Sequence, residues 1–111
     1  MKYDASCKDC ERLSSFLTQV KNKNPEYFCK PVPSFGKKTP PFLIVGLAPG
    51  MHGANRTGRP FTGDHAGILL YKTLYKFGFS NLETSQSIDD NLILKNCSIT
   101  NAVKCLPPDN K

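Results

Sequence analysis

The sequence lacks any apolar run long enough to cross a membrane. Its longest such stretch, residues 41–49, is less than half of the roughly 20 residues that a bilayer-spanning helix needs. It also lacks the apolar core of a signal peptide, because acidic residues and two cysteines occupy the first positions of the chain. We therefore expect a cytoplasmic protein with no membrane partner.

A complete disulfide framework is missing as well, because the chain has 5 cysteines, an odd number. A reducing compartment disfavours disulfides in any case. Metal ligation and free thiols remain as alternatives, and Cys97 is expected to be a buried thiol at a strand edge. The cysteines are Cys7, Cys10, Cys29, Cys97 and Cys105.

The composition is that of one folded domain with a basic surface. A chain of 111 residues allows a single domain, and 39% hydrophobic with 22% charged residues is too apolar for a disordered chain. The net charge of +6 favours a polyanionic partner such as nucleic acid. The alternative is charge that serves solubility alone.

The first half of the sequence predicts a helix, an irregular connection and a strand. Apolar residues recur at helical spacing over residues 11–21, after the first two cysteines. Residues 24–41 hold five prolines and a glycine, too many for any regular element. Residues 42–47 form a continuous apolar run, which predicts a strand buried on both faces, as in parallel sheets.

The second half predicts a long loop, a helix and a second strand. Residues 48–63 carry four glycines and two prolines, and a loop of that length inside a compact domain is usually functional. A helical pattern follows over residues 68–77, with Asp64 at the N-cap position and Gly78 after its end. Residues 80–91 are polar and predict a loop, and residues 98–103 predict a strand. This order predicts a right-handed parallel crossover and an α/β fold.

Two common phosphate-binding motifs are absent from the glycine-rich loop. Gly53 and Gly58 have P-loop spacing, but Arg59 and Pro60 follow where Lys and Ser/Thr must hold phosphate and magnesium. No G-x-G-x-x-G exists, so a dinucleotide site has no support. A loop that leaves the carboxyl end of a strand is nevertheless where ligands bind in open α/β sheets.

Three segments of the sequence resemble the uracil-DNA glycosylase superfamily, in particular its type-5 branch, which is related to the type-4 iron–sulfur enzymes. They are GLAPGMHGANRTGRPFTGD at residues 46–64, ITNAVKCLPPDNK at residues 99–111, and Cys7-x-x-Cys10. The resemblance implies a three-layer α/β/α fold with a central parallel sheet. Residues 1–111 are then expected to be the N-terminal portion of one such domain, truncated after the second strand.

The resemblance also assigns roles in a reaction that flips uracil or another deaminated base out of DNA and hydrolyses its N-glycosidic bond. Asn101 pairs with the uracil edge and Phe61 stacks on the base, whereas the alternatives are a strand-end asparagine and a core phenylalanine. Asp64 activates water and His52 stabilises the departing uracil or a phosphate, whereas the alternatives are an N-cap and a surface histidine. The remaining expected substrate-binding residues are Gly46, Ala48, Gly50, Gly53 and Asn55.

A [4Fe–4S] cluster is the cofactor that the resemblance implies, with Cys7, Cys10 and Cys105 as three of its four ligands. The family's fourth ligand lies beyond the third and past residue 111, and Cys29 is the substitute within the chain. The expected partners are DNA containing deaminated bases and a complementary C-terminal fragment, with a monomer as the full-length state. The alternative function is a non-catalytic remnant that binds DNA or iron.

Overall fold

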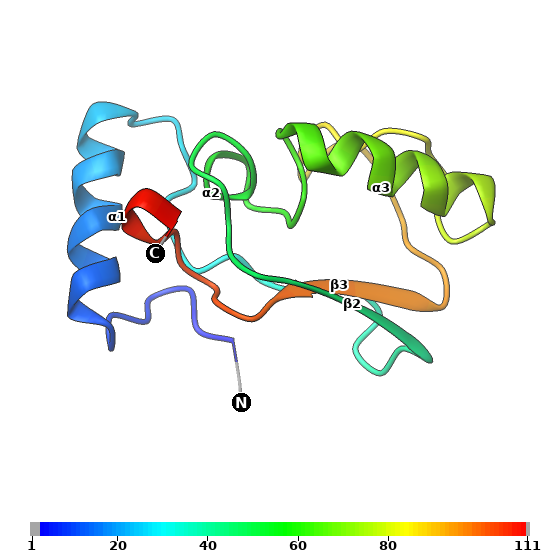
Figure 1. Ribbon diagram of the computed structural model, residues 1–111, viewed down its shortest axis with the longest axis horizontal. Helices are drawn as coiled ribbons and strands as arrows, with labels where there is room; N and C mark the ends of the chain where they lie inside the picture. Colours follow the sequence, from blue (N-terminus) through cyan, green and yellow to red (C-terminus); the bar gives the residue numbers. More distant parts are fainter. Residues whose placement is uncertain (1–2, 111) are drawn as a thin grey trace.

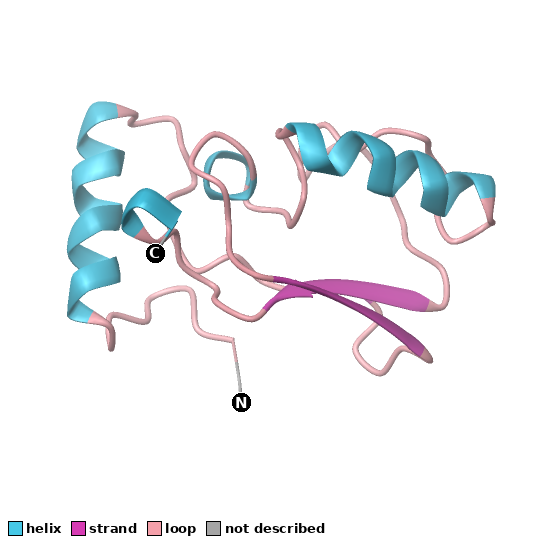
Figure 2. Ribbon diagram, in the orientation of Figure 1, coloured by secondary structure: helices cyan, strands magenta, loops and turns pink. Residues whose placement is uncertain are grey.

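The computed structural model describes residues 3–110, so Met1, Lys2 and the last residue of the C-terminal motif, Lys111, lie outside it. Figures 1 and 2 show a small sheet with helices above it and at its end. No helix within residues 3–110 is both long and apolar enough to span a membrane. The elements in chain order are α1 (Glu11–Lys23), β1 (Phe35–Gly36), β2 (Phe42–Gly46), α2 (Ala54–Thr57), α3 (His65–Lys76), β3 (Cys97–Asn101) and a 3-10 turn (Pro108–Asn110).

The sheet has the strand order β1-β3-β2. β2 and β3 are parallel, with Ile44 opposite Ile99 and Gly46 opposite Asn101, which confirms the predicted parallel pair and the α/β class. β1 pairs antiparallel with β3, so the prediction of no regular element in residues 24–41 is wrong. The two β1 residues carry no proline, and their amide groups are free to join the edge of the sheet.

The main core lies between α3 and one face of the sheet. Tyr71 and Leu74 of α3 pack with Cys97 and Ile99 of β3, and all four side chains are buried. The helix begins after Asp64, whose carboxylate accepts a hydrogen bond from the Gly67 amide at 3.3 Å. The predicted N-cap is therefore confirmed, and it fixes where the glycine-rich segment ends.

A second, smaller core holds α1 near the carboxyl ends of the strands. Leu17 and Val20 of α1 pack with Cys29 and Leu106, which lie in the segments before β1 and after β3. Figure 1 shows α1 at this end of the sheet, next to α2 and the chain's C-terminal turn. The amphipathic pattern of residues 11–21 predicted this helix, and the structure extends it to Lys23.

Two further boundaries differ from the sequence prediction. The long loop over residues 48–63 contains a one-turn helix, α2, because the amides at its start reach the carbonyls of Gly50 and Gly53. The second strand is Cys97–Asn101 rather than residues 98–103. Its pairing ends where Ala102 and Val103 bond instead to the carbonyls of Gly46 and Leu47.

β2 is not buried on both faces, contrary to the prediction from its apolar run. Leu43, Val45 and Leu47 alternate along the strand and are 52%, 60% and 75% exposed, so they share one bare face. Ile44 points the other way and packs against the core under α3. The difference arises because α3 covers only one side of the sheet in the described chain, whereas a strand buried on both faces needs two layers.

We expect Val45→Thr to change the free energy of unfolding by less than about 0.5 kcal/mol and to lower the fluorescence of a bound hydrophobic dye, because it removes exposed apolar surface. The matched control is Ile44→Thr, one residue away on the covered face. It is expected to cost about 1–2 kcal/mol. Urea unfolding and dye titration measure both effects. Equal destabilisation by the two variants would show that the β2 face is covered.

Candidate functional site

Gly46, Phe61 and Asn101 form one group at the carboxyl ends of β2 and β3. A Cβ atom on Gly46 would overlap the Asn101 Oδ1 atom and lie 2.7 Å from the Phe61 ring. Only glycine allows the side-chain amide and the ring to approach the strand so closely. The structure therefore brings together three of the residues that the sequence proposed for the base.

The side-chain amide of Asn101 has no hydrogen-bond partner in the described part of the chain, and although the residue is only 4% exposed, its amide atoms still reach the surface. Its backbone is held instead. The Lys104 ammonium donates to the Asn101 carbonyl at 2.5 Å and to the Thr100 hydroxyl at 2.5 Å. Because this amide is unpaired among the described residues and reaches the surface, it offers a donor and an acceptor to a ligand.

Phe61 adopts a left-handed backbone conformation, with φ at 55°. Such a conformation costs a non-glycine residue on the order of 1–3 kcal/mol and persists only where its surroundings enforce it. The neighbouring residues supply that restraint. The Tyr71 hydroxyl donates to the Pro60 carbonyl at 2.6 Å, and the Thr62 and Ser85 hydroxyl oxygens lie 2.6 Å apart. The half-buried ring also packs against the main core, as the core alternative predicted, and its stacking on a base stays a prediction.

A buried ion pair anchors the same segment. The Arg59 guanidinium lies 2.8 Å from the Asp90 carboxylate, with the two side chains 6% and 11% exposed, and its centre is 4.2 Å from the Phe35 ring centroid. Burial alone raises the pKa of Asp90. The Gln86 amide and Arg59 outweigh it and hold the pKa below its ordinary value. The ion pair thus ties the strained segment to residues 85–92 and to β1.

The two carboxylate oxygens of Asp64 lie in different surroundings. One carboxylate oxygen caps α3, as described above, and the other contacts the space in which a Cβ of Gly53 would lie. Asp64 and Phe61 also line a cavity of about 340 Å³ between the start of α3 and residues 83–85. Asn101 does not line that cavity. The N-cap role is therefore established, and the carboxylate is also open to a ligand.

His52 and Asn55 occupy different environments. His52 is exposed, and its Nδ1 atom lies 2.8 Å from the Tyr27 hydroxyl. Asn55 is fully buried, and its amide donates at 3.4 Å to both the Cys29 sulfur and the Met51 carbonyl. Its Oδ1 atom is a buried acceptor without a partner among the described residues. Asn55 braces the loop from beneath, and its contact with substrate stays a prediction, as does that of Ala48.

Cys7, Cys10 and Cys105 lie in one neighbourhood. Burial raises the pKa of the Cys105 thiol, and the nearby negative charges of Cys7 and Cys10 raise it further. Within residues 3–110 no three groups of the metal-ligating type converge on a single ion position. A [4Fe–4S] cluster asks for a different arrangement, because each thiolate binds its own iron atom. The three cysteines fit that donor set in chemistry, and a cluster held by them stays a prediction.

Sequence reasoning missed the residues that hold the site in place. Tyr27, Asp90 and Lys104 each fix a predicted site residue or its segment, but they lie in stretches without periodicity. The one local signal was Asp90 itself. Its carboxylate accepts amide hydrogens from Gln86 and Leu92, a turn pattern that aspartate favours in polar loops.

Comparison with known proteins places these residues in a family. The model of the "Uracil DNA glycosylase superfamily" matches residues 33–111, which hold the glycine-rich segment, β2 and β3. Curated relatives named "Type-5 uracil-DNA glycosylase" include one from Thermus thermophilus, 43% identical over 111 residues that cover 96% of this chain and 50% of the relative. One from Mycobacterium leprae is 44% identical over 94% of this chain and 48% of the relative. The chain thus spans about half the length of the curated relatives it matches.

Asp90→Asn is expected to cost about 3–5 kcal/mol near neutral pH, because Arg59 is left buried and unpaired. The pKa of Asp90 is lowered on folding, so its contribution is present above the ordinary carboxyl pKa of 3.8 and is lost as pH falls through the folded value. The variant should therefore lose the acid-side slope of the wild type. Urea unfolding between pH 3 and about 7 measures this. Asp89→Asn, on the exposed neighbour, is the control, and an identical pH profile in Asp90→Asn would contradict the role of the pair.

Proposed function

The chain belongs to the uracil DNA glycosylase superfamily, and we propose that its Gly46, Phe61 and Asn101 group holds uracil flipped out of DNA in a type-5-like glycosylase. One observation supports this above the others: the Asn101 amide has no hydrogen-bond partner within residues 3–110 and lies beside the Phe61 ring at the carboxyl ends of two parallel strands. That is where open α/β sheets bind ligands.

The proposed recognition follows from the amide and the ring. The Asn101 amide offers one donor face and one acceptor face, which match the O4 and N3–H edge of uracil and oppose the swapped pattern of cytosine. The Phe61 ring gives a stacking surface worth about 1–3 kcal/mol per base. These contacts offset part of the few kcal/mol needed to unstack the base. The strained conformation of Phe61 is consistent with a ring fixed in advance for this contact.

The proposed hydrolysis uses water as the nucleophile. Ala48 stands where the superfamily usually carries a carboxylate, so another group must accept the proton. Asp64 and Glu83 both line the cavity beside Phe61, and Asp64 is the one that lies in the family's glycine-rich segment. Water attacks C1′ of the deoxyribose as the bond to the base breaks, its proton passes to Asp64, and the base leaves as the uracil anion. A donor from His52, whose ring is oriented by Tyr27, stabilises the negative charge of the base or of a nearby phosphate.

Cys7, Cys10 and Cys105 are the residues proposed to hold a [4Fe–4S] cluster, which when bound supplies a rigid link between the N-terminal segment and the chain after β3. The proximity of the three thiols supports this. Cys29 remains the substitute ligand within the chain. Its sulfur is buried against the second core and accepts the Asn55 amide, so ligation by Cys29 requires loss of that contact.

The partner proposed beside DNA is a complementary C-terminal polypeptide. The bare face of Leu43, Val45 and Leu47 and the free edge of β2 fit a further strand and covering helix. The second candidate function is a non-catalytic remnant that binds DNA or iron. For the chain acting alone, the exposed apolar side chains of the β2 face favour this second function, because no layer covers that face within residues 3–110. A cytoplasmic location and a monomeric full-length state stay predictions.

Asn101→Asp is expected to lower uracil excision by at least about tenfold to hundredfold, because the carboxylate keeps an acceptor but loses the donor, at a cost of about 1–3 kcal/mol. Excision is measured on single-stranded DNA, for the chain alone and for the chain completed with the C-terminal half of the Thermus relative. Asn96→Asp, in the exposed segment before β3, is the control. Unchanged excision in Asn101→Asp would remove this residue from the base site.

Asp64→Asn and Asp64→Ala together separate capping from chemistry. Asparagine caps a helix about as well as aspartate, so Asp64→Asn should keep its stability and lose on the order of 10²-fold or more in the single-turnover rate. Asp64→Ala should lose the same rate and about 1 kcal/mol of stability in addition. If Asp64→Asn keeps the wild-type rate, Asp64 is an N-cap alone.

A further inference from the structure

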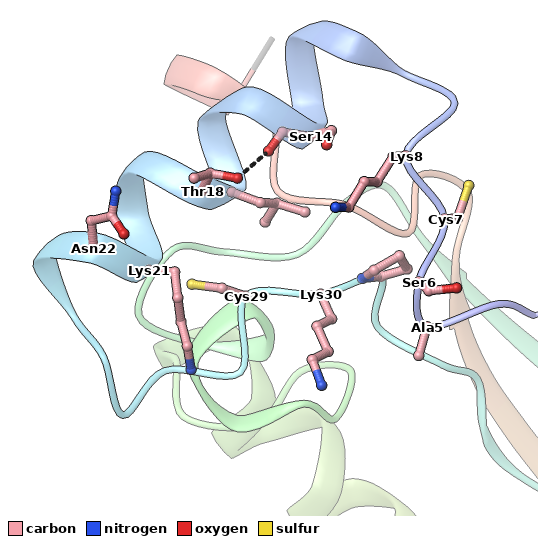
Figure 3. A pocket seen from close by; sticks show the side chains of 12 residues that line it. Ala5, Ser6, Cys7, Lys8, Ser14, Thr18, Lys21, Asn22, Cys29 and Lys30 are labelled. Atoms are coloured by element: carbon pink, nitrogen blue, oxygen red, sulfur yellow. Dashed lines mark hydrogen bonds between the residues drawn. The ribbon is translucent and has the colours of Figure 1, made fainter.

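A second cavity lies between α1 and the chain around Cys29. Its volume is about 380 Å³, within the range of small-ligand pockets. Figure 3 shows its walls: the N-terminal segment, one face of α1 and the segment that precedes β1. The α1 residues that line it, Ser14, Leu17, Thr18, Lys21 and Asn22, follow helical spacing and therefore share that face.

The charges of this cavity all have one sign. Lys8, Lys21 and Lys30 line it, and no acidic side chain is among its lining residues. In Figure 3 the three lysines come from three different segments, with Lys8 reaching toward the space in front of α1. Two acidic residues, Asp4 and Asp9, flank the N-terminal wall in sequence, and Asp4 is engaged by the Ser6 amide and hydroxyl. Three lysines therefore border one hollow, although the Lys21 ammonium donates to the Tyr27 carbonyl at 2.5 Å and the Lys30 ammonium lies 6.0 Å from the Phe28 ring centroid.

The other lining groups suit a phosphate attached to an organic residue. The Ser14 hydroxyl and the Asn22 amide are donors that line the cavity, whereas the Ser6 and Thr18 hydroxyls already donate to the Asp4 carboxylate and the Ser14 carbonyl. Leu17, Cys29 and Pro31 give an apolar floor on which a sugar or base can rest. A free inorganic anion has no apolar part to place on these side chains. A nucleotide can bind the donors through its phosphate and rest its sugar or base on the apolar floor.

We propose that this cavity, the lysine pocket, binds a nucleotide of the DNA strand outside the flipped base, through its phosphate and sugar. Its position supports this. The Phe28 and Cys29 amides bond to the Arg56 and Asn55 carbonyls of α2, each at 3.0 Å, and the Tyr27 hydroxyl reaches His52. The segment that forms one wall of the lysine pocket is thus attached directly to the loop of the base site. A DNA strand bound in the lysine pocket would therefore contact a segment that is itself bonded to the base-site loop.

The first experiment places one negative charge in the pocket. Thr18→Glu lies on the exposed α1 surface that lines it, and Gln19→Glu, the next residue, is exposed but does not line it. Affinity is measured by fluorescence anisotropy with a short single-stranded DNA that contains no uracil. Thr18→Glu should weaken binding by about fivefold or more at low salt, whereas Gln19→Glu should have at most half of that effect. Equal effects would overturn the proposal.

The second experiment counts the phosphate contacts. Lys8→Gln, Lys21→Gln and Lys30→Gln together are compared with Lys38→Gln, Lys76→Gln and Lys95→Gln, three exposed lysines at the opposite end of the sheet. Both sets remove the same net charge. The pocket set should reduce the slope of log K against log salt by about 2, and the control set by less than about 1. Equal slopes would mean that binding depends on net charge alone, which contradicts the lysine pocket.

A third measurement separates a strand from a free nucleotide. Thymidine monophosphate is added to the wild-type chain while the backbone amides of Ser14 and Thr18 are followed by NMR. The proposal expects the oligonucleotide to shift them at concentrations at least tenfold below those of the mononucleotide. Equal or tighter binding of the mononucleotide would overturn a DNA-strand site in favour of a free-nucleotide site. Because the DNA contains no uracil, failure of the proposed base recognition leaves these outcomes unchanged.

Discussion

The register of the parallel pair β2 and β3 determines where everything in the site lies. Because Gly46 is opposite Asn101, the two strands end together, and the glycine-rich segment and the Lys104 turn leave the sheet at the same edge. A shift of one residue would turn the Asn101 amide to the other face and point a β2 side chain at it. Gly46 then provides the room that the pairing demands, since any Cβ there would overlap the amide.

The segment that carries Phe61 is the second fixed part of the site. Residues 59–62 carry a strained Phe61 backbone, and they are held by the Tyr71 hydroxyl, the Ser85 hydroxyl and the Arg59–Asp90 pair. Tyr71 and Arg59 are buried and Ser85 and Asp90 are half-buried, so the ring is positioned by packed residues rather than by a mobile loop. A ring fixed before the base arrives costs less entropy on binding than one that must be ordered.

The local pattern of the sequence was enough to predict α1, α3, the Asp64 cap and the parallel pair, because these depend on periodicity and capping. Resemblance to the family supplied Phe61 and Asn101. Neither route predicted β1, whose two residues form a strand only because β3 offers an edge. The burial of β2 was predicted wrongly, because an apolar run shows that a strand can be covered but not what covers it. Asp90 and Tyr27 act across long sequence separations, and such pairs leave no local pattern.

The central claim is that the Asn101 amide, which is unpaired among residues 3–110, is the group that reads uracil. The most direct measurement is an NMR titration of the chain, with the Asn101 side-chain amide signals assigned by comparison with Asn101→Asp. Free uracil is added in one series and free cytosine in the other. The account predicts saturable shifts of the Asn101 side-chain amide with uracil and none with cytosine over the same range. Equal shifts with both bases, or shifts confined to residues far from Gly46 and Phe61, would contradict it.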